Sequence, residues 1–226
     1  MLRPLINFYQ RHAARRMFTR WSPLYETEVA ENSYSAADAV ARAALPLLAT
    51  RNANKPLIAD IGIGTGLLAQ QIYDSYPCRI IGLDFTEDMM AVAAAREIAE
   101  LLVKCDAGKD VWPILDNSCG MVISAGLGEY LSPEMLQHFL NESARVLQQN
   151  APLVFTYMPA AKNEKKTTYW RGHSGSYLVF GYEPEEMEER LAKAGLSLKR
   201  HEAPFKGCVF ADGSSYDYRL IIAEAS

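Results

Sequence analysis

The chain has 226 residues, of which 49% are apolar and 22% charged, with a net charge of −4 at pH 7. This size and composition suit one globular domain with a substantial core and argue against a second full domain, a disordered chain and a transmembrane protein, because no stretch approaches the roughly 20 apolar residues of a bilayer span. Residues 1–25 hold five arginines and no acid, which leaves 18 basic against 27 acidic residues, or −9, in the rest. An acidic body of this kind disfavours nucleic acid as a partner.

The four cysteines are scattered along the chain and form no C-x-x-C pair or His-Cys cluster. They are Cys78, Cys105, Cys119 and Cys208. This spacing predicts neither a disulfide framework nor a zinc site, so we expect no metal and a cytoplasmic protein with reduced thiols.

The arginine-rich start is predicted to be an amphipathic helix. Apolar residues recur at helical spacing from Leu2 to Met17, while Arg3, Arg11 and Arg15 fall largely elsewhere. A helix packed on the body is favoured over a membrane-surface helix, and a transit peptide is the alternative that the arginines leave open. An aromatic segment, Trp21 to Tyr25, follows, and Tyr34 precedes an alanine-rich helix over 35–49. Residues 1–50 are therefore expected to form helices that cap a core over 56–226.

Residues 56–69 predict a strand, a tight glycine turn and a helix. The apolar run Leu57 to Ala59 ends in Asp60, and glycines then alternate with other residues at 62, 64 and 66. Glycine allows unusual backbone angles and close approach to a ligand, and the free N–H groups of the next helix point toward the same place. A dinucleotide fingerprint needs G-x-G-x-x-G, whereas Leu67 stands where the third glycine would be. The spacing therefore argues against NAD.

The stretch from Asp60 to Gly66 resembles motif I of the class I S-adenosylmethionine-dependent methyltransferases. Ile63 stands where the family more often has a smaller residue, a departure that we do not expect to close the site. The resemblance implies that the cofactor is S-adenosylmethionine and that motif I binds it. The residues carried over from motif I are Asp60, Gly62, Ile63, Gly64 and Gly66. Many small-molecule members also lay aromatic rings over the methionine end of the cofactor, and Tyr25, then Tyr34, are the candidates.

Two further acids end predicted strands, about 23 residues apart along the chain. Arg79 to Asp84 reads as the second strand and Leu101 to Asp106 as the third. A carboxylate at the end of the second strand can accept bonds from both ribose hydroxyls. In the family, the acid at the position of Asp106 accepts from the adenine amino group, and the N–H of the next residue, Ala107, meets the ring. We also expect Phe85, Met89 and Ser124 beside the cofactor.

The catalytic group does not follow from the cofactor motifs, because methyl transfer depends mainly on positioning. A fourth strand over 119–124 runs into Glu129 and Tyr130, and a polar segment over 159–182 contains His173. These three residues are the candidates for a base, with His173 favoured because an unperturbed imidazole titrates near neutral pH, although a solvated loop residue is the better explanation of each. The segment 159–182 shows no clear periodicity and is predicted to be a lid or acceptor loop.

The predicted fold is a single α/β domain with a doubly wound, seven-stranded sheet in the order 3-2-1-4-5-7-6. Strand 7 would be antiparallel, and strands near 196–202 and 216–224 would form a terminal hairpin. The expected function is transfer of a methyl group to an O, N or C nucleophile of a small-molecule acceptor, by a monomer or a homodimer. Alternatives are a non-catalytic member that binds a partner, an aminopropyl transferase, which lacks support because no paired Asp motif follows the fourth strand, and an NAD oxidoreductase.

Overall fold

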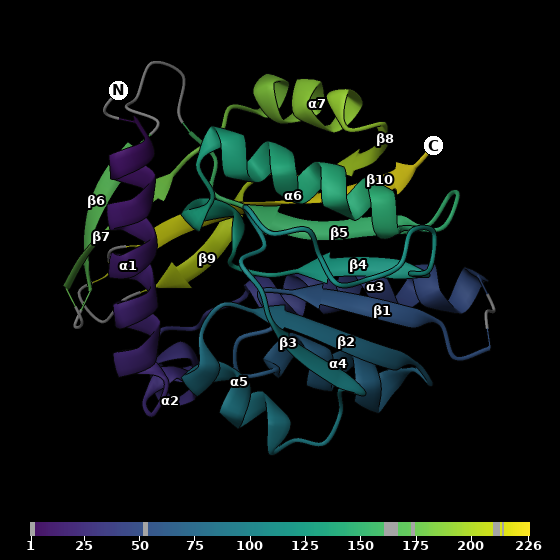
Figure 1. The fold of residues 1–226 in the computed structure, drawn as a ribbon, viewed down its shortest axis with the longest axis horizontal. Helices are drawn as coiled ribbons and strands as arrows, with labels where there is room; N and C mark the ends of the chain where they lie inside the picture. Colours follow the sequence, from purple (N-terminus) through teal and green to yellow (C-terminus); the bar gives the residue numbers. More distant parts are fainter. Residues whose placement is uncertain (1–2, 52–53, 161–166, 173–174, 210–212, 214) are drawn as a thin grey trace.

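The structure, a computed structural model, describes residues 3–51, 54–160, 167–172, 175–209, 213 and 215–226, and the side chains of these residues outside 3–11, 167–172 and 175–178. Its centre is a twisted sheet in the order β3-β2-β1-β4-β5-β10-β8, with β9 paired to β10 (Figure 1). These strands, in chain order, are β1 (Leu57–Ile61), β2 (Arg79–Asp84), β3 (Leu101–Lys104), β4 (Met121–Ser124), β5 (Pro152–Tyr157), β8 (Leu196–His201), β9 (Phe205–Val209) and β10 (Ser215–Ala225).

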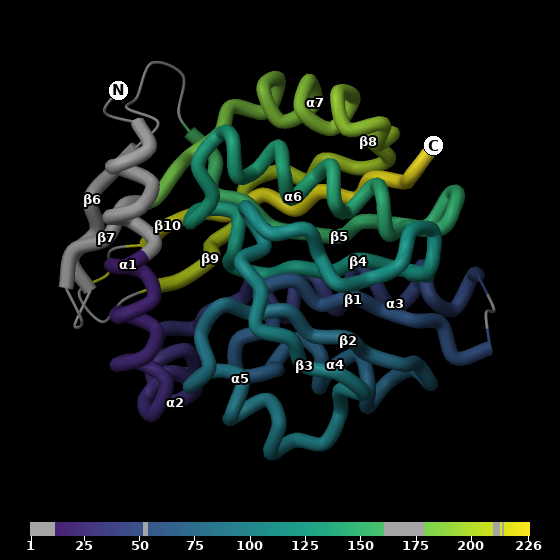
Figure 2. Tube along the Cα trace, viewed as in Figure 1, coloured from purple at the N-terminus to yellow at the C-terminus, as the bar shows by residue number. Residues whose placement is uncertain are grey.

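The predicted strand order is confirmed. Strands β1 to β5 are parallel, and β10 runs antiparallel to both β5 and β8. In the Cα trace, β1 and β4 occupy the middle of the molecule, whereas β3 and β8 lie at opposite edges of the sheet (Figure 2). Consecutive parallel strands require a crossover, and the helices between them supply it.

Side-chain alternation along the strands produces two cores, one on each face of the sheet. Ala59 and Ile61 of β1 face the core under α6 and α7, whereas Ile58 faces the core under α3 and α4. The helices are α3 (Ala36–Arg51), α4 (Leu67–Ser75), α5 (Glu87–Ala94), α6 (Pro133–Val146) and α7 (Pro184–Lys193). Both faces of the sheet are thus covered, as parallel sheets require.

Local signals set the ends of these helices as the sequence predicts. Ser132 accepts a hydrogen bond from the Met135 N–H at the start of α6, with Pro133 at the first helical position. Pro184 begins α7, and Gly195 follows its end with a φ of +77°. Among the described residues, none of the helices combines the length and the apolarity that crossing a membrane would need.

The N-terminal cap lies across the carboxyl ends of the parallel strands. It consists of α1 (Arg3–Trp21) and α2 (Tyr25–Glu31), and α1 runs alongside a separate two-stranded sheet made of β6 (Thr167–Gly172) and β7 (Gly175–Phe180) (Figure 1). The prediction that 159–182 has no regular structure is therefore wrong for these two stretches. Aromatic and β-branched residues favour the strands, but the lysines at 162, 165 and 166, just before β6, give the segment as a whole the composition of a polar loop.

Strand β9 was also not predicted, and it fixes the junction between α2 and α3. The Ser35 N–H donates to the Gly207 carbonyl at 3.0 Å, and the Val209 N–H donates to the Asn32 carbonyl at 2.9 Å. A Cβ on Gly207 would lie 2.3 Å from the Tyr218 ring, so only glycine allows this close pairing. The terminal strands thus hold the segment that carries Tyr34.

Candidate functional site

A cavity opens at the carboxyl ends of the parallel strands, beneath the cap. It encloses about 930 Å³ of empty space, including its open mouth. Its lining residues are Ala14, Phe18, Tyr25, Gly62, Gly64, Leu83, Asp84, Phe85, Met89, Cys105, Asp106, Ala107, Gly108, Ala125, Gly126, Leu127, Tyr130, Leu131 and Met135. Crevices at this edge are the usual ligand sites of open α/β sheets. Eight of the predicted cofactor residues, and Tyr130, meet here.

The glycine turn forms one wall of this cavity. Gly62 and Gly64 have φ values of +75° and +56°, which explains why these positions are glycine. The N–H groups of Gly62 and Ile63 both donate to the Leu83 carbonyl, which ties the turn to the end of β2. A Cβ on Gly64 would find no protein atom nearer than 3.9 Å, so the space beside it belongs to the cavity.

Asp84 joins the glycine turn to the next helix. Its Oδ2 accepts from the Gly64 N–H at 2.9 Å, and its Oδ1 accepts from the Thr86 N–H at 2.8 Å. Burial raises the pKa of Asp84, although these hydrogen bonds oppose the shift. Asp84 also lines the main cavity, so the carboxylate that braces the turn stands beside the place of a ligand.

Asp60 lies in a smaller adjoining cavity with a buried oxygen that has no partner. This side cavity encloses about 370 Å³ and shares Tyr25, Gly62 and Gly64 with the main one. Asp60 is 1% exposed, and its Oδ2 has no hydrogen bond from any described residue. Burial, and then the charge of Asp84, raise the pKa of Asp60 to about 8. A buried acceptor of this kind calls for a polar or cationic ligand group.

Ile63 and Tyr34 also line the side cavity. The Ile63 side chain packs among Ile80, Ala93 and Ile98, on the far side of the turn. The side chain at the position that departs from the family pattern is therefore part of the core.

The cap covers the main cavity with aromatic side chains. The Phe18 ring lies 6.4 Å from the Phe85 ring and 5.2 Å from the Tyr130 ring, measured between centroids. The Trp21 and Tyr25 rings meet edge to face at 4.8 Å. These pairs hold the N-terminal helices on the ends of the strands, because aromatic contacts of this geometry contribute stabilisation beyond that of the buried apolar area.

Asp106 and Ala107 line the main cavity on the segment between β3 and β4. The Asp106 carboxylate accepts from the Gly108 N–H at 3.2 Å, a short turn that holds the side chain in place. The Trp112 indole N–H donates to the Ala107 carbonyl at 3.2 Å. Trp112 is 1% exposed, so it anchors the segment in the core.

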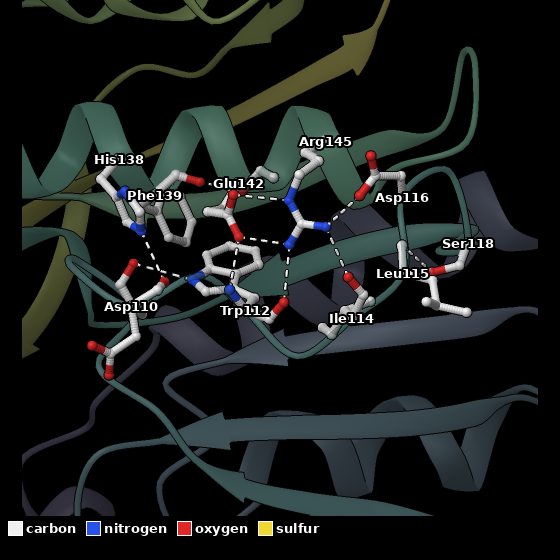
Figure 3. Close-up of polar contacts among 12 residues, drawn as sticks. Asp110, Trp112, Ile114, Leu115, Asp116, Ser118, His138, Phe139, Glu142 and Arg145 are labelled. Atoms are coloured by element: carbon white, nitrogen blue, oxygen red, sulfur yellow. Dashed lines mark hydrogen bonds and ion pairs between the residues drawn. The ribbon is translucent and has the colours of Figure 1, made fainter.

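A buried ion pair on α6 holds the rest of this segment (Figure 3). Glu142 accepts from the Trp112 N–H at 2.7 Å and pairs with Arg145 at 2.6 Å. Arg145 also donates to the Ile114 carbonyl at 2.8 Å and to Asp116. Burial acts to raise the pKa of Glu142, but the hydrogen bonds from Arg145 and Trp112 outweigh it and hold that pKa below its usual range. Sequence reasoning missed this network, although Glu142 and Arg145 stand at i, i+3 on a predicted helix.

Glu129 lies in a short 3₁₀ helix, η1 (Gly128–Tyr130), and is 4% exposed. Its Oε1 accepts from the Tyr218 hydroxyl, and Tyr34 in turn hydrogen-bonds to Tyr218. Its Oε2 has no hydrogen bond from any described residue. Burial raises the pKa of Glu129 to about 7, although the bond from Tyr218 opposes the shift. Tyr218 was not predicted, because 89 residues separate it from Glu129.

Three of the predicted site residues that the structure describes, Gly66, Ser124 and Glu129, line neither cavity. Gly66 faces α5, where an added Cβ would lie 3.2 Å from Arg96 and 3.4 Å from Ala93. The buried Ser124 hydroxyl donates to the Ile61 carbonyl at 2.7 Å and so joins β4 to β1. His173 lies outside the described residues.

The site suits S-adenosylmethionine, the cofactor that the resemblance implies. The cofactor carries a positive sulfonium and an ammonium group, and the described lining of both cavities includes three carboxylates but no Lys, Arg or His. The unpartnered Oδ2 of Asp60 fits the ammonium group, and the carboxylate of Asp84, at the end of β2, fits the ribose hydroxyls. Asp106 and the N–H of Ala107 fit adenine.

Comparison with known proteins agrees with this site. Residues 58–150 match a family model described as a methyltransferase domain. No curated protein matches the chain.

Three solved structures share the fold. One is a chain of the complex between the Haloferax volcanii Trm112 methyltransferase activator and a methyltransferase, at 18% identity over 93% of this chain and 96% of that one, with a TM-score of 0.69. A Methanosarcina mazei S-adenosylmethionine-dependent methyltransferase has 15% identity over 80% and 97%, with a TM-score of 0.65. Magnesium protoporphyrin IX methyltransferase from Synechocystis PCC 6803, with bound S-adenosylmethionine, has 16% identity over 84% and 79%, with a TM-score of 0.61. At these identities the likeness is one of fold.

Proposed function

We propose that the chain is an active class I S-adenosylmethionine-dependent methyltransferase that methylates an O, N or C nucleophile of a small-molecule acceptor; the methyltransferase-domain match over residues 58–150 and the shared fold support this. The observation that carries the proposal is the position of Asp84. Its carboxylate braces the glycine turn through Gly64 and also lines the cavity. A glycine turn with only a structural purpose would need no such carboxylate in a cavity.

When bound, the cofactor supplies an electrophilic methyl group on a sulfonium. The residues that we assign to its binding are Tyr25, Tyr34, Asp60, Gly62, Ile63, Gly64, Asp84, Phe85, Met89, Asp106 and Ala107. Gly66 and Ser124 take part by shaping the turn and the strand ends. Positioning of the acceptor against the methyl group provides much of the rate enhancement in such reactions, and the enclosed aromatic cavity provides the positioning.

Glu129 is the base that we favour among the three candidates. Its pKa of about 7 suits proton transfer near neutral pH, and its Oε2 is free to accept a proton. Tyr130 lines the cavity beside it and would orient the acceptor. Tyr25, Tyr34 and Tyr218 surround the carboxylate, and they exclude water from it.

A small acceptor is supported by the dimensions and the lining of the cavity. The space is largely apolar and aromatic and lies under helices, an arrangement that suits a compact molecule better than a polymer. The relative from Synechocystis acts on magnesium protoporphyrin IX, which is a small molecule. We also propose a cytoplasmic location and a monomer or homodimer.

The competing function is that of a protein with the methyltransferase fold that works together with a protein partner or only binds one. The Haloferax relative was solved with a protein activator, which favours this alternative over others. A screen of acceptor libraries for release of S-adenosylhomocysteine tests the two functions. Turnover of a small molecule by the isolated chain, lost in Glu129→Gln with cofactor affinity retained, supports our proposal; cofactor binding without turnover of any acceptor contradicts it.

A further inference from the structure

Arg96 links two parts of the cofactor site that are distant in sequence. It stands just after α5, and its side chain is 21% exposed. Its Nε donates to the Thr65 carbonyl at 2.7 Å, and its Nη2 pairs with the Glu26 carboxylate on α2. One guanidinium therefore holds both the glycine turn and the cap.

The first of these bonds fixes the turn. Thr65 lies between Gly64, which faces the main cavity, and Gly66, which begins α4. An added Cβ on Gly66 would lie 3.2 Å from the Cδ of Arg96, so the arginine stem packs against the turn in addition to its hydrogen bond. Gly66 has a φ of +85°, a backbone conformation that favours glycine without any contact to the cofactor.

The second bond fixes α2. Glu26 follows Tyr25, whose ring lines both cavities. Two residues further along the helix, Glu28 accepts from the Trp21 indole N–H at 2.6 Å, and the Trp21 ring packs on Tyr25. A displacement of Glu26 would therefore move Tyr25 and its neighbouring ring together.

We propose that Arg96 is a positioning residue for the cofactor, which sets the place of Tyr25 relative to the glycine turn. The inference rests on the proposed function. Arginine suits this task because its planar fork directs several N–H groups along fixed lines, one of them to a carbonyl and another to a carboxylate. Lysine carries one donor atom and cannot reproduce both bonds. Arg96 acts through Tyr25 and touches neither the cofactor nor the reacting atoms.

The test measures the effect of Arg96→Lys in the wild-type protein and in the Tyr25→Ala variant, together with a matched control. Affinity for S-adenosylhomocysteine is measured by calorimetry in the wild type, Arg96→Lys, Tyr25→Ala and the double variant. Hydrogen exchange of residues 25–31 is measured in the free proteins. The control is Arg79→Lys, which breaks the exposed pair with Glu100 at the other end of β2.

We expect Arg96→Lys to weaken the binding of S-adenosylhomocysteine about tenfold, or by about 1.4 kcal/mol, and Arg79→Lys to leave this affinity unchanged. In the Tyr25→Ala background, Arg96→Lys should have less than a twofold effect, because residues that act as one unit are not additive. Residues 25–31 should exchange faster in free Arg96→Lys, with α3 unchanged.

Equal losses of affinity in both backgrounds would overturn the proposal, since Arg96 would then act independently of Tyr25, through the glycine turn or through general stability. Unchanged exchange of residues 25–31 would also overturn it. If the wild type binds no S-adenosylhomocysteine, the proposed function fails, and the exchange measurement in the free protein still decides whether Arg96 holds α2.

Discussion

The carboxylate of Asp84 accepts a hydrogen bond of 2.9 Å from the Gly64 N–H, so the end of β2 and the glycine turn after β1 form one rigid corner of the site. A charged acceptor on a backbone N–H is among the stronger hydrogen bonds in proteins. This corner is where the ribose of the cofactor is expected, and several predictions can be made from it.

Replacing Asp84 by alanine should weaken S-adenosylmethionine binding about ten- to a hundredfold. The loss corresponds to about 1.5–3 kcal/mol for hydrogen bonds to a charged group in a partly buried site. Calorimetry measures the affinity, and circular dichroism checks that the variant is folded. Unchanged affinity in a folded variant would remove Asp84 from the cofactor site.

Replacing Gly64 by valine should abolish cofactor binding. The side chain would project into the main cavity, and the φ of +56° adds backbone strain that a β-branched residue tolerates poorly. The melting temperature should fall only modestly, because no protein atom lies close to the added Cβ. A large loss of stability with residual cofactor binding would make Gly64 a structural turn residue instead.

The stability of the free protein should decrease as the pH rises from about 4 to 8. Asp60 has a folded pKa raised to about 8, so its protonated form is favoured in the folded state and its contribution is lost as the pH rises through that value. Glu129, with a pKa raised to about 7, acts in the same direction. Asp60→Asn should flatten the curve, by at most about 1.4 kcal/mol per pH unit.

Urea denaturation at several pH values measures this slope. Asp74→Asn, which removes an exposed carboxylate from α4, is the matched control. Cofactor binding should tighten over the same pH range in the wild type and not in Asp60→Asn, because the ionised carboxylate attracts the ammonium group. An equally steep stability curve in Asp60→Asn contradicts the assignment.

Glu142→Gln should destabilise the protein by about 1–3 kcal/mol and should also weaken cofactor binding. The change removes one of the two carboxylates that pair with the partly buried Arg145 and loosens the segment that carries Asp106 and Ala107. Thermal denaturation and calorimetry provide the two readouts. Glu186→Gln, which breaks the pair with Arg190 on α7, should lower stability with cofactor affinity unchanged. Equal cofactor affinity in both variants would show that the Glu142 network does not support the site.

The cap should act as a lid. Binding of S-adenosylhomocysteine should slow hydrogen exchange in α1 and α2, because Phe18 and Tyr25 close over the cavity. Deletion of residues 1–20 should reduce turnover of a validated acceptor. Protection confined to the glycine turn and the strand ends, or full turnover by the truncated protein, would contradict the role of the N-terminal segment.

Much of the fold and the cofactor half of the site could be predicted from sequence, because those signals are local. The glycine turn and the acids at 60, 84 and 106 each stand at the end of a short apolar run, and parallel strands bring such ends to one edge. The β6–β7 sheet was missed because the lysines just before β6 give the segment 159–182 the composition of a polar loop.

Contacts between distant residues leave no periodic trace and were not predicted. Arg96 meets residues 31 and 70 positions away, and Glu129 meets Tyr218 across 89 positions. Arg96 follows α5, and only the folded chain shows that its guanidinium bonds both the glycine turn and the cap helix α2.

The central claim is that this cavity binds S-adenosylmethionine and not a dinucleotide. Parallel calorimetric titrations of the wild type with S-adenosylmethionine, S-adenosylhomocysteine and NAD test it most directly. The account predicts one binding site per chain for each of the first two ligands and no measurable heat from NAD. Binding of NAD with no response to either sulfur compound would contradict it.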